Sequence, residues 1–130
     1  MKTWFGMVGL LVACSKTPAG TSVELPDGSP GIGFDDLRYS SRLHRVLVPS
    51  GRSGRLNLVD PDTLAVTSIT GFSSTPDYSG GHDDGATSVD EASGVLYVTD
   101  RTTRALVTVD PVAQQIVGSI ALASVLQTFA

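Results

Sequence analysis

Apolar and polar residues alternate along the chain in short runs, most clearly in its last third. These runs are rich in Val, Ile, Tyr and Thr, which strands favour, and turn residues separate them. The pattern predicts four short antiparallel β-strands. Their expected ranges are 86–91, 95–100, 105–110 and 115–122.

A weaker copy of this pattern begins fifty residues earlier. VLVPSGRSGRLNLVDP (46–61) aligns without a gap with LYVTDRTTRALVTVDP (96–111). A fixed period of this size indicates a repeated supersecondary unit. The first copy therefore predicts four more strands, at about 36–40, 45–49, 55–60 and 65–71.

An Asp-Pro pair follows the third strand of each copy, at Asp60 and Asp110. Proline has no N–H group for a strand ladder, and its fixed φ suits the second position of a turn. The preceding aspartate can accept hydrogen bonds from backbone N–H groups of the turn. We interpret Asp60 and Asp110 as turn formers rather than catalytic carboxylates.

The second copy, LYVTDRTTRALVTVDPVAQQIVGSI, resembles a repeat of the YVTN family of β-propellers. Residues 97–99 match the Tyr-Val-Thr of that repeat, and Asp100 stands where asparagine is usual. The first copy has Leu-Val-Pro at these positions, and Pro49 indicates an edge or a locally broken strand. The resemblance covers about residues 33–122 and implies a fold, not an activity.

The expected fold is all-β and β-propeller-like, with two four-stranded antiparallel blades at about 34–72 and 84–122, followed by a tail at 123–130. In such a fold the alternating faces of neighbouring blades bury one another. Propellers have about four to eight blades, so two blades do not close a ring. We therefore expect an incomplete propeller: a fragment, a truncated product, or an oligomer that completes the ring.

The first fourteen residues, MKTWFGMVGLLVAC, combine Lys2 with an apolar run that ends at Ala13. The run is too short to span a bilayer as a helix and is typical of a secretory signal. Its end, LVAC, resembles the lipobox of bacterial lipoproteins, which implies cleavage before Cys14 and lipidation of its thiol. The alternative is an ordinary signal peptide or buried helix with a free cysteine. The resemblance implies a lipid-anchored protein of the cell envelope, and Ser15 favours the outer membrane or periplasmic face over the inner membrane.

Residues 15–33 are rich in Ser, Thr, Pro and Gly and predict a flexible tether, with at most a short strand at 21–25. Beyond Cys14 the chain has eight basic and thirteen acidic residues and no basic cluster. A nucleic-acid partner is therefore not expected, because phosphate binding needs clustered Lys and Arg. The membrane contact would come from the lipid at Cys14.

The stretch with most chemical interest joins the two copies. Its HDDG motif places His82, Asp83 and Asp84 on a glycine-flanked loop, and Asp35 and Asp36 precede the first strand of the first copy. Imidazole and carboxylate groups bind metals, but the spacing matches neither an EF-hand nor a zinc signature. Such loops line the channel mouth of a propeller, so these five residues are the candidate ligand-contact loop. The alternative is turn chemistry, and no metal or other cofactor is predicted.

A nucleophile system is not evident, since the sequence has no Gly-x-Ser-x-Gly motif and a single cysteine. No catalytic residue is predicted. The expected function is a non-enzymatic binding or scaffold role, with a protein partner, an unknown ligand or self-association that completes the propeller. The alternatives are a fragment of a propeller enzyme, lactonase-like or a metal-dependent hydrolase, and a truncated product without independent function.

Overall fold

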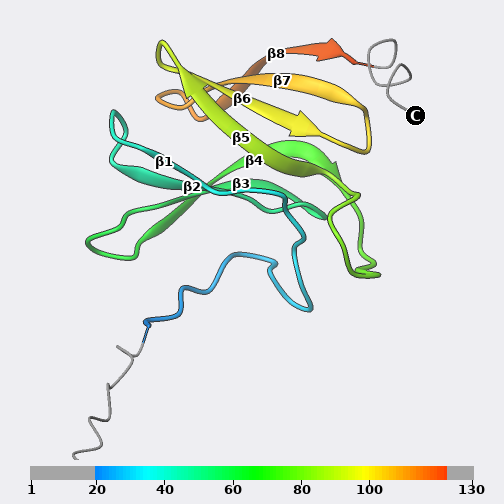
Figure 1. Ribbon diagram of the computed structural model, residues 1–130, viewed down its shortest axis with the longest axis horizontal. Helices are drawn as coiled ribbons and strands as arrows, with labels where there is room; N and C mark the ends of the chain where they lie inside the picture. Colours follow the sequence, from blue (N-terminus) through cyan, green and yellow to red (C-terminus); the bar gives the residue numbers. More distant parts are fainter. Residues whose placement is uncertain (1–19, 123–130) are drawn as a thin grey trace, which may run out of the picture.

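The computed structural model describes residues 20–122, which form two four-stranded antiparallel sheets and no helix (Figure 1). The predicted all-β, two-blade, propeller-like fold is confirmed. The first blade contains β1 (Arg38–Ser40), β2 (Arg45–Pro49), β3 (Ser53–Val59) and β4 (Val66–Ser74). The second blade contains β5 (Ala86–Ala92), β6 (Val95–Asp100), β7 (Ala105–Asp110) and β8 (Gln115–Ala121). In each blade the strands lie in chain order.

Several predicted features fall outside the described residues. These are the signal segment 1–14 with Cys14, the first part of the tether, and the tail 123–130. Within residues 20–122 no helix is long and apolar enough to cross a membrane.

The strand boundaries follow the predicted ones to within one residue, apart from three larger differences. β1 starts at Arg38 because the backbone N–H of Asp35 donates to the carbonyl of Thr87 in the second blade. β3 begins two residues early, at a register shift that pairs Ser53 with Ser74 and lengthens β4. No strand forms at 21–25, where the described chain offers this segment no strand to pair with.

Both Asp-Pro turns form as predicted. The Asp60 Oδ1 accepts hydrogen bonds from the N–H groups of Asp62 (3.0 Å) and Thr63 (2.9 Å). Asp110 accepts the equivalent bonds from Val112 and Ala113. The hydrogen bond from the Thr63 backbone is the main reason why the pKa of Asp60 lies below its ordinary value.

Pro49 ends β2, an interior strand of the first blade. β1 pairs with β2 only as far as Leu47. The next residue, Ser50, donates its N–H to the carbonyl of Arg55, toward β3. Successive backbone nitrogens of a strand point to opposite sides, so the ring nitrogen of Pro49 points to the β1 side, beyond the last residue that pairs with β1. The missing N–H therefore interrupts no ladder.

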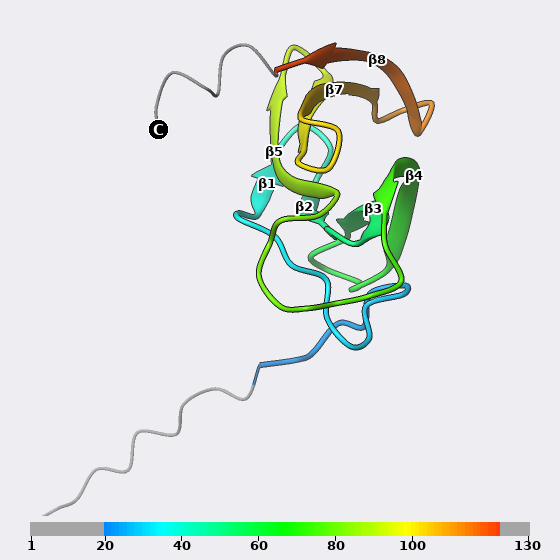
Figure 2. The same cartoon turned by 90° about the vertical axis from the view of Figure 1, so that its right-hand side faces the viewer.

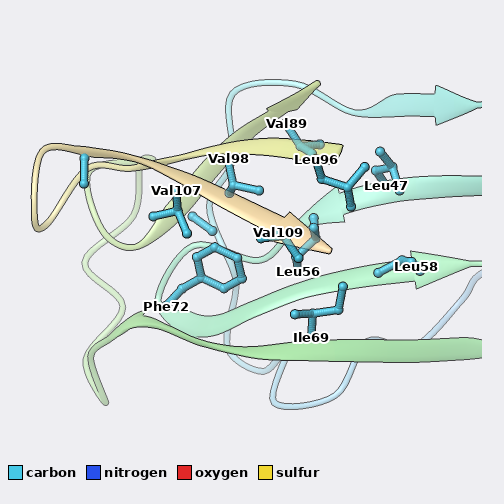
Figure 3. Close-up of a cluster of buried hydrophobic side chains, with 12 residues drawn as sticks. Leu47, Leu56, Leu58, Ile69, Phe72, Val89, Leu96, Val98, Val107 and Val109 are labelled. Carbon is cyan, nitrogen blue, oxygen red and sulfur yellow. The ribbon is translucent and has the colours of Figure 1, made fainter. Parts of the chain in front are cut away.

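The two blades pack face to face around one core. We call the two faces of each sheet its front and its back, and the front of the first blade contacts the back of the second. Cross-strand partners share a face of a sheet, so the register defines the faces. The front of the first blade, which faces the second blade, carries Leu47, Leu56, Leu58 and Ile69. The back of the second blade carries Val89, Leu96, Val98, Val107 and Val109. Figure 3 shows the two sets of side chains pointing toward each other, with Phe72 beside them.

The outer face of the first blade, its back, is not open. Residues 20–33 run along the side of β1–β4 that is turned away from β5–β8 (Figures 1 and 2). The Arg52 guanidinium donates to the carbonyls of Gly31 (2.6 Å), Asp27 (3.0 Å) and Ser29. Arg55, on the back of β3, forms an ion pair with Asp27 at 2.6 Å. Residues 27–31, which lie in the predicted tether, are therefore bonded to the first blade.

Candidate functional site

Three of the five predicted ligand-contact residues meet in the structure. The His82 imidazole Nδ1 contacts the Asp35 carboxylate. Arg101 lies between two carboxylates, with its Nε 3.5 Å from Asp35 and its Nη1 3.2 Å from Asp83. We call Asp35, His82, Asp83 and Arg101 the clasp. It joins the segment before β1, the loop between the blades and the turn after β6.

Backbone hydrogen bonds at the start of β5 position the clasp. The N–H of Gly51 donates to the carbonyl of Ala86, and the N–H of Arg101 to that of Gly85, both at 2.8 Å. Gly33 has a φ of 67°, and a Cβ there would lie 2.2 Å from the carbonyl oxygen of Gly81. Only glycine permits this approach of the two loops.

The charges of the clasp are directed at one another. Burial alone would raise the pKa of Asp35, but hydrogen bonds from Thr87 and His82 and the charge of Arg101 lower it below the ordinary value. Asp35 is therefore a carboxylate whose oxygens already have partners. Within residues 20–122 no three His, Cys, Asp or Glu side chains are grouped so as to hold a metal ion. The arrangement is that of an interloop ion cluster.

The other two predicted residues lie apart from the clasp. Asp84 makes no hydrogen bond or ion pair with any described residue. Asp36 lines a groove of about 340 Å³ beside β5, together with Arg38, Asp90 and Tyr97. Arg38 forms an ion pair with Asp90 at 2.9 Å, and this hydrogen bond is the main reason why the pKa of Asp90 lies below its ordinary value.

The groove belongs to the front of the second blade, the face turned away from the first blade. Tyr97 pairs with Thr108, and Thr99 pairs with Leu106, which in turn pairs with Ile120. Ile120 is 60% exposed and Tyr97 36% exposed. Residues 36–38 border this face at the groove, beside Tyr97, Thr99 and Leu106, but among residues 20–122 no sheet packs on it. We call its side chains the open front: Tyr97, Thr99, Leu106, Thr108 and Ile120.

The sequence marked the residues of the open front only through the repeat. Tyr97 and Leu106 are the repeat equivalents of Leu47 and Leu56, which are fully buried. Ile120 takes the place of Ile69, because each lies opposite its equivalent leucine in the register. Alternation and the repeat mark Tyr97 and Leu106 as residues of one face, but only the structure shows that this face is exposed.

Comparisons of the chain with family models, curated proteins and solved structures find no match.

Proposed function

We propose that this chain is a lipid-anchored protein of the bacterial cell envelope that acts by docking a partner on the open front rather than by catalysis. The observation that carries the proposal is the contrast between repeat-equivalent positions. Ile69 is 1% exposed under the second blade, whereas Ile120 is 60% exposed. An apolar sheet face that the same repeat buries elsewhere in the molecule is a natural contact surface.

The anchor rests on the resemblance of LVAC to a lipobox. A thioether-linked diacylglyceryl group and an acylated amino terminus at Cys14 would give several acyl chains, enough for stable attachment. The segment between Cys14 and the first described residues would then hold the blades close to the bilayer.

The propeller-enzyme alternative gains no support from the clasp. A general base or metal ligand needs a free lone pair directed at a reacting atom or an ion. The Asp35 oxygens instead meet His82 and Arg101, and Arg101 also meets Asp83. These contacts favour a structural role that ties the loops together.

The anchor is tested by growing cells that express the chain with an alkyne-tagged fatty acid. We expect label on the wild-type chain in the membrane fraction and none on Cys14→Ser. Label that is absent from the wild type would contradict the anchor.

The docking role is tested in the same membranes with a photoreactive phenylalanine analogue at position 120. The control is position 112, whose valine is 85% exposed but lies in the β7–β8 turn, off the open front. Docking predicts a covalent protein adduct from position 120 and none from position 112. The absence of an adduct at position 120 would contradict the docking role.

A further inference from the structure

We infer that the partner on the open front is a second copy of this chain, related to the first by a two-fold axis. The inference rests on the docking role proposed above and names its partner. Its starting point is the internal interface, where one blade's front, with Leu47, Leu56 and Ile69, is covered by another sheet. The open front repeats this arrangement with Tyr97, Leu106 and Ile120.

The back of the first blade would be the matching surface for front-to-back stacking of copies, but it is occupied. Val48 and Val59 are 7% and 8% exposed, and Asn57 is fully buried. Residues 20–33 run along this side, and Arg52 bonds three of their carbonyls. The open front is therefore the apolar sheet face that the described part of the chain leaves available.

Copies that use one and the same surface form a closed two-fold pair, whereas a ring or filament needs a second, different surface. The chain should therefore stop at two copies. Back faces that are closed by residues 20–33 end the stack on both sides of the pair.

The charges of this face permit contact between two identical copies. Tyr97, Thr99, Leu106, Thr108 and Ile120 are uncharged. At the rim, Arg38 and Asp90 neutralise each other within one copy, and Asp36 adds one negative charge. The chain has a formal net charge of −4, so two copies repel each other as a whole. Contact through this face adds little to that repulsion, because the face carries few charges.

The size of the face predicts a weak and reversible pair. Four strands spaced by about 4.8 Å, each about six residues long, cover roughly 400 Å². A standard stable interface buries about 800 Å² per partner. Anchoring in one membrane raises the effective concentration of copies and would compensate for the low affinity.

The first test is sedimentation velocity of the full chain over a concentration series. We expect a monomer–dimer equilibrium and no larger species that depends on the front. Ile120→Asp and, independently, Thr108→Arg should shift the chain to monomer, because each places like charges across the two-fold axis. Val112→Asp, off the face, should leave the equilibrium unchanged. All variants carry the same apolar residues 4–13, so a difference between them reports the face, and circular dichroism verifies the fold.

The identity of the photo-adduct at position 120 completes the test. An adduct with the mass of two chains supports the pair. An adduct with a different protein overturns the inference but keeps the docking role, and the absence of an adduct overturns both. The inference also fails if the open front supports growth beyond two copies, or if folded Ile120→Asp and Thr108→Arg associate like the wild type.

Discussion

The two blades share one repeat and one strand order, yet their fronts differ in exposure. Leu47, Leu56 and Ile69 are at most 1% exposed, whereas Tyr97 and Ile120 are 36% and 60% exposed. A register shift in β7–β8 places Ile120 opposite Leu106, as Ile69 lies opposite Leu56. The repeat thus determines which residues share a face, while the neighbouring sheet determines whether that face is buried.

The backs of the blades differ in chemistry as well as in cover. The centre of the second back is Val107, but the equivalent residue of the first is Asn57, which is fully buried. Asn57 donates to Ser50 Oγ at 2.6 Å and accepts from Ser68 Oγ at 2.5 Å. A buried amide needs such partners. The first back therefore has a hydrogen-bonded polar centre, whereas the second has an apolar one.

The largest effect should come from shortening a leucine at repeat-equivalent positions. Leu56→Ala should lower the free energy of unfolding by about 2–5 kcal/mol, because it leaves a cavity between the blades. Leu106→Ala, on the open front, should cost less than about 1.5 kcal/mol. Urea unfolding of both variants measures the difference, and equal losses would show that the two fronts are equally covered.

The next effect concerns the segment along the first back. Arg52→Ala should cost about 1–3 kcal/mol, because it leaves several carbonyls of residues 27–31 without their buried donor. Arg55→Ala removes only a partly exposed pair with Asp27 and should cost less than about 1 kcal/mol. Hydrogen exchange at the backbone amides of Gly28 and of position 52 provides a local measurement. If exchange there were equally slow in the wild type and in Arg52→Ala, Arg52 would not be what holds the segment.

The clasp should make a smaller contribution that depends on pH. The folded-state pKa of Asp35 lies below the ordinary value of 3.8, so its stabilisation is present above the unfolded-state pKa and is lost as the pH falls through the folded-state pKa. Asp35→Asn should therefore be less stable than the wild type at neutral pH, and the gap should close at acidic pH. Unfolding at several pH values tests this, with Asp84→Asn as the control that leaves the curve unchanged. A gap that persists at acidic pH would mean that Asp35 acts through packing rather than charge.

The strands and the Asp-Pro turns could be predicted from the sequence because their causes are local. Alternation defines faces, and Asp60 and Asp110 bond N–H groups only two and three residues away. The clasp was predictable only as a set of candidates, since Asp35 and His82 are 47 residues apart and meet through interblade backbone bonds. The binding of residues 27–31 by Arg52 could not be predicted from the sequence, because no periodic pattern marks it. From the sequence alone, an arginine beside a turn is expected to be a solvated surface charge.

The smallest effect concerns the start of the third strand of each blade. Gly54 and its repeat equivalent Arg104 both have a positive φ, 68° and 53°. A side chain is strained in this region, whereas glycine is not. Arg104→Gly should therefore raise the free energy of unfolding by about 0.5–1 kcal/mol. The reverse change, Gly54→Arg, should destabilise, because its Cβ would lie 2.9 Å from the carbonyl oxygen of Phe72. Thermal unfolding of the two variants measures both changes; a loss of stability in Arg104→Gly would mean that Arg104 contributes a side-chain contact that outweighs its backbone strain.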